Sequence, residues 1–353
     1  MLQNSIRTVA LFRLCYFRKL VEQGYKVYCI APMDDEVALK KVKDVGVTVL
    51  TVKPGSYLRL AVSMNLRALK LILSHRSNTV VVVHFVVTIV LTAPSLLLAK
   101  RVVCVIEGIG TAFSGRDGLK KVLKFGISRL STLSIFMNAY ERSEVGRPDD
   151  VVLGGVGIDL SKYTPAMPNS VEPDKPINLL FVGRLVRDKG IFDLFSVMRL
   201  LQKRGIDFTM NIVGQTYSAN SGTLTDYDLQ QAQEEFGESL VLHGYLDNLV
   251  QLYQNADLFL FLSWHEGFPV CVMEANACGK PVFAYDVPGC NHAITEGING
   301  RLFSPGKVVQ VADAIVSGGF SKFDKPCRNY AQKYFDQNIK ADELVELITS
   351  VAN

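Results

Sequence analysis

The stretch LFLFLSWHEGFPVCVMEANACGKPVFAY, residues 258–285, contains an apolar run, a polar loop, a helical pattern and a second apolar run. The runs Leu258–Leu262 and Pro281–Tyr285 are short and uninterrupted, which is typical of parallel strands buried on both faces. Pro269 suits the first position of a helix, and we expect that helix to cover about Val270 to Ala277. Strand, helix and strand in this order predict part of a doubly wound parallel sheet.

The whole chain repeats this alternation. At 353 residues it is longer than one ordinary hydrophobic core, so we expect two domains. Residues 163–176 contain four prolines and few apolar residues, as a linker does. The predicted fold class is α/β, with doubly wound, Rossmann-like domains at 1–162 and 177–327 and a helical stretch at 328–353 that could pack on either domain. The predicted strands are Val27–Ala31, Val47–Val52, Val80–His84, Val102–Ile106, Leu133–Met137 and Val151–Gly154 in the first domain, and Leu179–Val182, Phe208–Val213, Leu240–His243, Leu258–Leu262 and Pro281–Tyr285 in the second.

The two halves of the chain differ in charge. Residues 1–150 hold 22 Lys and Arg against 11 Asp and Glu, whereas residues 151–353 hold 16 against 23. A basic half indicates contact with something anionic. Nucleic acid is a weak candidate, because the chain has no zinc-ligand spacing, no RNP-type motif and no Arg-rich arm. An anionic membrane surface fits the pattern better.

The seven cysteines are scattered without a CxxC pair, which is typical of free thiols in a reducing compartment. No stretch has the features of a cleavable signal peptide. The segment TVVVVHFVVTIVLTAPSLLLA, residues 79–99, is apolar over about the width of a bilayer, so an integral membrane protein is one alternative. The β-branched run Val80–Val83, followed by His84 and the Pro94-Ser95 break, favours a strand, a loop and a helix instead.

A basic loop follows the first strand of the second domain. LLFVGRLVRDKG, residues 179–190, predicts a strand that ends at Gly183, a turn with Arg184 and Lys189, and then a helix. Ligands of doubly wound sheets bind beyond the carboxyl ends of the strands. Two cations beside a helix N-terminus suit a diphosphate, although the turn alone fits two solvated bases equally well. The turn has neither GxGxxG nor GxxxxGK[ST], which counts against dinucleotide oxidoreductases and P-loop ATPases.

Two glutamates stand in the opening stretch with seven residues between them. Glu266 follows a strand, Gly267 lets a ligand approach the backbone, and Glu274 lies about one turn inside the predicted helix. Carboxylates accept hydrogen bonds from hydroxyl groups. Helix capping would be the ordinary explanation for a lone pair of glutamates. Together with Arg184 and Lys189, however, the pair describes a nucleotide-sugar site.

These motifs resemble those of the retaining, GT-B-fold glycosyltransferases of family 4, the glycosyl transferases group 1. The shared features are a Glu-x7-Glu motif at Glu266 and Glu274, a Gly-Arg-x4-Lys loop at 183–189, and the block DVPGCNHAITEGINGRLF at 286–303 with Gly289, Glu296, Asn299 and Gly300. The resemblance covers nearly the whole chain. It implies that an N-terminal acceptor domain and a C-terminal nucleotide-sugar domain face each other across a cleft.

The resemblance also implies roles for single residues. Arg184 and Lys189 would neutralise the donor diphosphate and stabilise charge on the departing nucleotide. Glu274 would hold the ribose hydroxyls, and Glu266 would contact the transferred sugar. UDP is the commonest carrier in the family, and no metal ion or other cofactor is expected. The implied donor-binding residues are Gly183, Arg184, Lys189, Glu266, Gly267, Phe268, Pro269, Val270 and Glu274.

Two further candidates lie in the first domain. His84 ends a predicted strand, and Glu107 follows the next strand in VIEGIG. A lone histidine at a strand end is more often a core or capping residue. The resemblance implies instead that His84 faces the donor sugar and that Glu107 orients the acceptor hydroxyl. Both are therefore candidate catalytic residues, together with Arg184, Lys189 and Glu266.

Two amphipathic segments predict membrane contact. RDGLKKVLKFGISRL, residues 116–130, places apolar residues at helical spacing beside basic ones, which suits a helix lying on an anionic membrane. YLRLAVSMNLRALKLIL, residues 57–73, repeats the pattern more weakly. Core-packed helices with a solvated basic face are the alternative for both. The apolar residues of the first segment are Leu119, Val122, Leu123, Ile127 and Leu130, and its candidate membrane or acceptor contacts are Arg116, Lys120, Lys121, Lys124 and Arg129.

The resulting prediction is a hexosyltransferase that moves a sugar, with retention, from a nucleotide donor to a polyprenyl-diphosphate-linked or other surface-polysaccharide acceptor, as in bacterial capsule, O-antigen or lipopolysaccharide assembly. We expect it in the cytoplasm, bound peripherally to the inner face of the cytoplasmic membrane. One alternative is a GT-B-fold nucleotide-sugar 2-epimerase. Another is a truncated, inactive remnant that still binds nucleotide, because MLQNSIRTVAL, residues 1–11, is a poor central strand and the first glycine is Gly24. Either the true start lies upstream, or the first sheet lacks its innermost strand.

Overall fold

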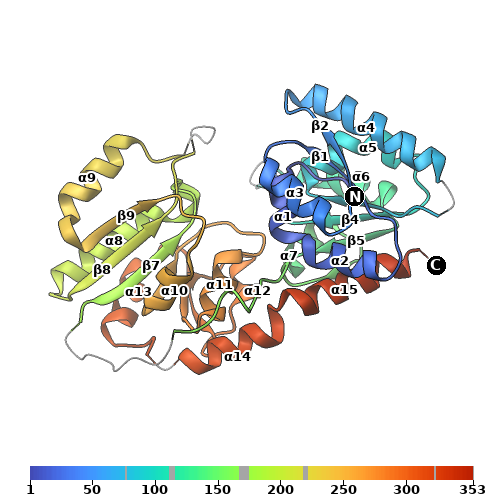
Figure 1. The fold of residues 1–353 in the computed structure, drawn as a ribbon. Helices are drawn as coiled ribbons and strands as arrows, with labels where there is room; N and C mark the ends of the chain where they lie inside the picture. The colour runs from blue at the N-terminus through green and yellow to red at the C-terminus, as the bar shows by residue number, and fades with distance from the viewer. Residues whose placement is uncertain (76–77, 111–115, 167–174, 218–221, 322, 353) are drawn as a thin grey trace. The chain divides into compact units, whose positions relative to one another are not determined.

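The computed structural model describes residues 1–75, 78–110, 116–166, 175–217, 222–321 and 323–352. The chain forms two compact units, which are drawn in Figure 1. Unit 1 consists of Met1–Gly157 together with Gln337–Asn353, and unit 2 is the continuous stretch Ile158–Asp336. The predicted linker, 163–176, belongs to the first part of unit 2, and its residues 167–174 lie outside the described part of the chain.

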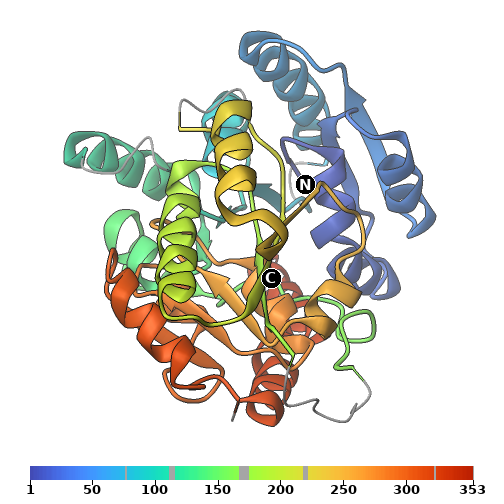
Figure 2. The same cartoon turned by 90° about the vertical axis from the view of Figure 1, so that its left-hand side faces the viewer.

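Unit 2 is built on a six-stranded parallel sheet in the order β12-β11-β10-β7-β8-β9. Figure 2 shows the helices α8 (Ile191–Lys203) and α9 (Asp226–Phe236) side by side. The rings of Phe195 from α8 and Phe236 from α9 pack together with centroids 5.8 Å apart. The strands are β7 (Ile177–Val182), β8 (Phe208–Val213), β9 (Leu240–Gly244), β10 (Leu258–Phe261), β11 (Val282–Tyr285) and β12 (Gly300–Phe303). The helices are α8 (Ile191–Lys203), α9 (Asp226–Phe236), α10 (Val250–Asn255), α11 (Val270–Ala277), α12 (Cys290–Ala293), α13 (Val308–Val316) and α14 (Asp324–Tyr334), with short 3-10 helices η2 (Arg187–Lys189) and η3 (Gly237–Ser239).

Unit 1 contains a four-stranded parallel sheet, β3-β4-β5-β6, and a parallel pair, β1-β2. Helix α15 (Gln337–Ser350), red in Figure 1, packs alongside α2 (Leu14–Glu22), although the two helices are far apart in the sequence. The strands are β1 (Tyr28–Pro32), β2 (Thr48–Val52), β3 (Val81–His84), β4 (Val102–Ile106), β5 (Leu133–Phe136) and β6 (Val151–Val152). The helices are α1 (Ile6–Phe12), α2 (Leu14–Glu22), α3 (Glu36–Asp44), α4 (Tyr57–Ser74), α5 (Val86–Leu96), α6 (Asp117–Leu130), α7 (Ala139–Val145) and α15 (Gln337–Ser350).

Each apolar run of the sequence overlaps a strand of the structure, because residues of this kind are buried on both faces of a parallel sheet. Strand β12 was not predicted, since the exposed Arg301 interrupts its apolar pattern. The helical stretch predicted at 328–353 is shared between the units. It forms the end of α14 in unit 2 and then α15 in unit 1.

The first residues of the chain lie between β1 and β3. Leu2 forms parallel bridges with Ile30 on one side and Val83 on the other. Its amide nitrogen donates to the carbonyl oxygen of Val82 at 2.8 Å, and the amide of Ile30 donates to the carbonyl oxygen of Met1 at 2.9 Å. Residues 1–3 thus join the edges of β1 and β3 through parallel bridges and backbone hydrogen bonds.

The long apolar segment at 79–99 forms β3 and α5, which agrees with the predicted strand and helix. Helix α5 continues through Pro94, where a break was predicted. The Asn65 side chain from α4 accounts for this, since its Nδ2 donates to the Leu91 carbonyl oxygen at 2.8 Å and its Oδ1 accepts from the Ser95 amide at 2.9 Å. These bonds satisfy backbone groups that a proline disturbs in a helix. No helix in the part of the chain that the structure describes has the length and apolar character that a membrane crossing needs.

Candidate functional site

The loops after β7 and β10 are held together at the carboxyl end of the unit 2 sheet. A Cβ atom at Gly190 would lie 1.9 Å from the carbonyl oxygen of Leu262, and the φ angle of Gly190 is +74°, so glycine is required there. The amide of Trp264 donates to the Asp188 carbonyl oxygen at 2.9 Å, and the Ser263 hydroxyl donates to the same oxygen at 3.2 Å. Since β7 and β10 are neighbouring parallel strands, their loops form one surface.

Lys189 and Glu266 meet on this surface. The Lys189 ammonium group donates to Oε1 of Glu266, and the two side chains are only 15% and 11% exposed. The loop after β11 closes on the same turn, because a Cβ atom at Gly289 would lie 2.6 Å from the carbonyl oxygens of Glu266 and Gly267. The structure thus brings a predicted phosphate-binding cation within hydrogen-bond reach of the predicted sugar-binding carboxylate.

Arg184 lies at the start of the loop after β7, and Lys189 lies at the end of the same loop. Its side chain is exposed, and its Cζ atom is 5.5 Å from the centre of the Tyr217 ring, a cation–π distance. The backbone here is compact, since a Cβ atom at Gly214 would lie 1.8 Å from the carbonyl oxygen of Gly183. Sequence reasoning did not find Tyr217, because a half-exposed tyrosine in a polar loop carries no periodic signal.

Helix α11 begins directly after Glu266 and its loop. Pro269 is the N-cap residue, one position before the helix start predicted for it, and Val270 is the first helical residue. The Phe268 ring packs edge-on against Phe335 with centroids 6.0 Å apart, which anchors the turn within unit 2. The positive end of the α11 dipole therefore lies beside Glu266 and Lys189, where it favours an anionic ligand.

Glu274 lies on α11 and faces two tyrosines. The Tyr253 hydroxyl donates to its Oε2 at 2.9 Å, and the Tyr163 hydroxyl is a second hydrogen-bond partner. Burial raises the pKa of the Glu274 carboxyl group, and the two hydroxyl donors offset part of that rise. Tyr253 is fully buried and Tyr163 nearly so, hence Glu274 is held in one orientation. Neither tyrosine stands out in the sequence.

Residues of the block at 286–303 form hydrogen bonds with α11 and hold it in place. The buried amide of Asn299 donates to Oδ1 of Asn276 at 2.7 Å, and the amide of Asn276 donates to the Asn299 carbonyl oxygen at 3.0 Å. A Cβ atom at Gly300 would lie 2.2 Å from the Val282 carbonyl oxygen, and Glu296 accepts from the Leu302 amide at 2.6 Å. These contacts are structural, and they fix the helix that carries Glu274.

The candidates of unit 1, His84 and Glu107, contact each other. Nδ1 of His84 lies 2.7 Å from Oε1 of Glu107, and Nε2 lies 3.1 Å from the Tyr16 hydroxyl. The Arg13 guanidinium donates to both Glu107 oxygens, to Oε2 at 2.6 Å, and its Nε donates to Gln3 at 3.2 Å. His84 is fully buried, Arg13 is 2% exposed, and the Glu107 side chain is 9% exposed. Both ring nitrogens of His84 therefore have protein partners.

Burial and Arg13 set the charges of this cluster. Burial and the nearby Arg13 lower the pKa of His84 to about 4, so its ring is neutral at pH 7. Burial by itself would raise the pKa of Glu107, but Arg13 and His84 outweigh it and lower that pKa to about 2. The cluster thus contains one charged pair and a neutral imidazole. The catalytic roles that we predicted for His84 and Glu107 stay predictions.

The turn after His84 is backbone-strained. Phe85 has φ +66° and ψ +138°, a region that bulky residues rarely occupy. Its amide donates to the Val105 carbonyl oxygen at 3.0 Å, which ties the turn to β4. The sequence gives no indication of this strain.

The predicted membrane helix α6 divides its apolar residues between two faces. Leu123 and Ile127 are buried in the core of unit 1, with Leu130 packed against that core, so these do not face outward. Leu119, Val122 and Phe125 are 45%, 69% and 69% exposed. Arg116, Lys121, Lys124 and Arg129 are exposed, whereas Lys120 is paired with Glu144.

Helix α4 has the clearer outward apolar stripe, although we predicted the weaker signal there. Leu58, Val62, Leu66 and Leu73 lie about one or two helical turns apart and are 74%, 53%, 64% and 59% exposed. The exposed Arg59, Arg67 and Lys70 flank this stripe. Met64, Ala68 and Ile72 form the opposite, buried face.

Comparison with known proteins identifies the second unit. Residues 164–318 match the family described as glycosyl transferases group 1. This part of the chain is a group 1 glycosyltransferase domain. The chain is accordingly a glycosyltransferase, as its motifs predicted.

Curated relatives extend the match. An enzyme of Campylobacter jejuni, N,N'-diacetylbacillosaminyl-diphospho-undecaprenol alpha-1,3-N-acetylgalactosaminyltransferase, is 26% identical over 327 aligned residues, which cover 82% of this chain and 80% of that protein. The D-inositol 3-phosphate glycosyltransferase of Paenarthrobacter aurescens is 31% identical over 179 residues, 47% of this chain and 42% of that protein. The second match thus spans less than half of the relative.

The fold is shared more widely than the sequence. The crystal structure of Anabaena Alr3699/HepE in complex with UDP matches 99% of this chain and 98% of its own chain, with a TM-score of 0.77 and 17% identity. At this identity the likeness shows the fold alone. The glycosyltransferase therefore has the GT-B fold, with two parallel-sheet, Rossmann-like units.

Proposed function

We propose that the chain transfers a sugar from a nucleoside diphosphate donor, UDP first among the candidates, with retention of anomeric configuration. The observation that carries the proposal is the contact of Lys189 with Glu266 beside the N-terminus of α11, within a group 1 domain. Cations and a helix N-terminus suit a diphosphate, and the neighbouring carboxylates suit sugar hydroxyls. The Anabaena protein of the same fold was solved in complex with UDP, which supports this class of donor.

Each residue has a role in this proposal. Lys189 and Arg184 bind the diphosphate and stabilise the charge that develops on the departing nucleotide. Glu274, held by Tyr253 and Tyr163, accepts hydrogen bonds from the ribose hydroxyls. Glu266 binds the transferred sugar. Because protein cations and the α11 dipole can carry the leaving-group charge, we propose that the reaction needs no metal ion or other cofactor.

For the acceptor we propose a saccharide on a polyprenyl diphosphate. The name of the Campylobacter jejuni relative specifies a diphospho-undecaprenol-linked acceptor, and that relative matches most of this chain. An acceptor of this kind lies in a membrane, so the enzyme would bind peripherally to the inner face of the cytoplasmic membrane. The exposed stripe of α4, with its flanking bases, and the outer residues of α6 fit an anionic lipid surface.

The test is sugar transfer by the purified protein, with bacterial membranes as acceptor source and a panel of radiolabelled UDP-sugars. Label should enter the lipid fraction with the wild type and with Glu235→Gln, a surface variant that matches the change in charge. The amount of label in the lipid fraction should fall at least tenfold with Glu274→Gln. The configuration of the new linkage, read by NMR, should equal that of the donor.

Three outcomes would contradict the proposal. Inverted linkages would exclude retention. Conversion of the UDP-sugar without any acceptor would indicate a 2-epimerase. Binding of UDP without turnover of any donor would indicate a nucleotide-binding protein that has lost transferase activity.

A further inference from the structure

Asp193 lies in the first turn of α8, and its carboxylate binds the ends of two other segments of unit 2. Its Oδ2 atom accepts from Nε1 of Trp264 at 2.8 Å and from the hydroxyl group of Tyr285 at 3.0 Å. Trp264 stands three residues after the end of β10, and Tyr285 is the last residue of β11. One oxygen atom thus joins the start of α8, the loop after β10 and the end of β11.

Each of these three segments carries a part of the candidate donor site. Lys189 lies four residues before Asp193, and Glu266 lies two residues after Trp264. The segment after β11 leads to Gly289, where a Cβ atom would lie 2.6 Å from the carbonyl oxygen of Glu266. The carboxylate of α8 therefore fixes the turn with the glutamate relative to the turn with the lysine.

An aspartate in the first turn of a helix is usually explained by capping or by the helix dipole. The N-cap residue of α8 is Gly190, and within the described part of the chain the Asp193 carboxylate bonds to no amide of its own helix. Tyr285 is fully buried, and burial together with the nearby carboxylate raises the pKa of its hydroxyl group. This hydroxyl group stays a donor that needs an acceptor, and Asp193 supplies it.

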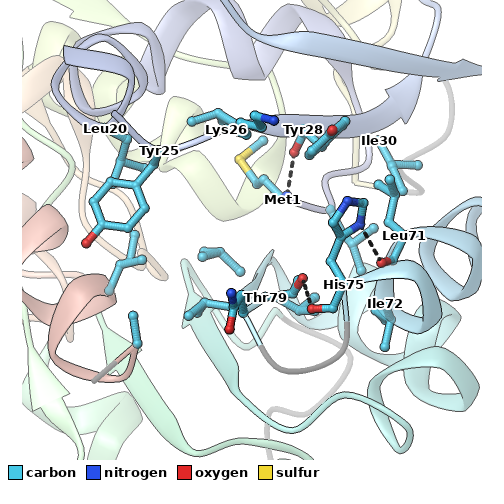
Figure 3. A pocket seen from close by; sticks show the side chains of 18 of the residues that line it. Met1, Leu20, Tyr25, Lys26, Tyr28, Ile30, Leu71, Ile72, His75 and Thr79 are labelled. Atoms are coloured by element: carbon cyan, nitrogen blue, oxygen red, sulfur yellow. Dashed lines mark hydrogen bonds between the residues drawn. The ribbon is translucent and has the colours of Figure 1, made fainter. Parts of the chain in front are cut away.

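The surroundings of Asp193 show which kind of role fits it. The rings of Trp264 and Tyr285 pack edge-on with centroids 5.6 Å apart, beside the carboxylate that binds both. A different arrangement lines a cavity of about 320 Å³ in unit 1, where Leu20 and Ile72 lie on opposite sides of an open space (Figure 3). Since both donors to Oδ2 are protein groups in contact with each other, the carboxylate holds protein segments together.

We propose that Asp193 is a positioning residue for sugar transfer. It fixes Trp264 and Tyr285, and it thereby holds the turn that carries Glu266. The inference rests on the proposed function, in which Glu266 binds the transferred sugar. A misplacement of about 1 Å at a reacting centre can cost ~10²-fold in rate. Because the cations and the carboxylate of α11 bind the UDP part of the donor, the loss falls on kcat and not on the affinity for UDP.

The experiment compares Asp193→Ala with Asp193→Asn in the full chain. Both bonds end on Oδ2, so the one carbonyl oxygen of an asparagine can accept both, although the charge is lost. The alanine variant should lose about tenfold in kcat for sugar transfer, and its Kd for UDP should stay within about twofold of the wild type. The asparagine variant should keep about half of the wild-type kcat or more. Asp226→Ala, the matched control, removes an exposed acid from the first turn of α9 and should change neither quantity.

Fluorescence gives a second measurement that does not depend on turnover. Trp264 is the one tryptophan of the chain, so its emission reports on this cluster directly. Acrylamide should quench that emission more strongly in the alanine variant, because the indole ring loses the acceptor that holds it. The asparagine variant should behave as the wild type does.

Three results would overturn the inference. Equal quenching in the wild type and the alanine variant would show that Asp193 does not hold Trp264. A lower Tm with unchanged kcat would make the role purely structural. Equal losses of kcat in the alanine and asparagine variants would assign the effect to the charge at the start of α8. A wild-type protein that transfers no sugar would instead refute the proposed function, and the quenching comparison would still decide whether Asp193 holds Trp264.

Discussion

Each unit of the enzyme places a carboxylate beside a cation, and the two arrangements differ in their access to solvent and ligand. In unit 1, Glu107 is bound by Arg13 and His84, and all three are nearly or fully buried. In unit 2, Lys189 and Glu266 keep 15% and 11% of their side chains exposed at the carboxyl ends of two strands. A sealed pair holds the fold together, whereas a partly open pair can exchange one partner for a ligand.

Residue type alone thus does not distinguish a sealed ion pair from a partly open one. Removing one member of a buried pair leaves a charge without compensation, which typically costs about 3–5 kcal/mol. At a strand end, the same change removes a ligand contact and leaves water as a substitute partner. If the two clusters divide stability and catalysis in this way, substitutions in unit 1 should change mainly stability and substitutions in unit 2 mainly the rate of sugar transfer.

The largest expected effect is on the stability of unit 1. Arg13→Met leaves the Glu107 carboxylate buried without its guanidinium, so the free energy of unfolding should fall by about 3–5 kcal/mol. Urea unfolding would measure it. Arg18→Met is the matched control, because Arg18 is exposed on the neighbouring helix. Similar losses for both variants would show that the cluster is not sealed.

The next effect is catalytic and belongs to unit 2. Lys189→Met should lower kcat/KM for sugar transfer by about 10²–10³-fold, the usual result of removing one group that stabilises developing charge. Its urea midpoint should stay close to that of the wild type. Lys203→Met, at the exposed end of α8, should change neither quantity. A stability loss with unchanged kcat/KM would reverse the comparison between the clusters.

A smaller effect should appear as the pH falls. The folded protein holds the pKa of His84 at about 4, below the unfolded value near 6.5, so the unfolded chain binds the proton first. The contribution of His84 to stability should therefore decrease as the pH falls from about 6.5 towards 4, by about 2 kcal/mol at pH 5 relative to pH 8. His84→Gln should remove most of this slope, and His75→Gln should leave it unchanged. Equal slopes in all three proteins would place the titration elsewhere.

The smallest expected effect is that of a chelator. EDTA should leave the rate of sugar transfer unchanged, and added Mg²⁺ should not raise it. The Asp-x-Asp sequence at 226–228 starts α9, where Thr225 and Asp228 form a capping box, so the Asp228 carboxylate already caps the helix. A rate that EDTA abolishes and Mg²⁺ restores would refute transfer without a metal.

Much of the fold could be predicted from the sequence, because each buried parallel strand needs an uninterrupted apolar run. Strand β12 was missed, since only part of it is buried. The candidate donor-site residues were predicted because their types and spacing form a motif. Tyr253 and Tyr163 belong to no pattern, and only the tertiary structure brings them to Glu274.

Arg13 shows a different limit. It lies between two short helices and looks like any surface arginine, yet it is 2% exposed because Glu107, 94 residues away in the sequence, pairs with it. Helix amphipathicity was ambiguous for a related reason. Both α4 and α6 have apolar residues on more than one face, and the sequence does not say which face meets the core.

The placement of α15 also sets the order in which the protein can be completed during synthesis. Unit 2 is one continuous stretch, whereas unit 1 needs Gln337–Asn353 in addition to its first 157 residues. Domains commonly fold in the order in which they leave the ribosome. Here unit 1, whose synthesis starts first, must wait for residues 337–352, while unit 2 can finish before it. A nonsense mutation shortly before codon 337 would consequently damage the unit that contains residues 1–157.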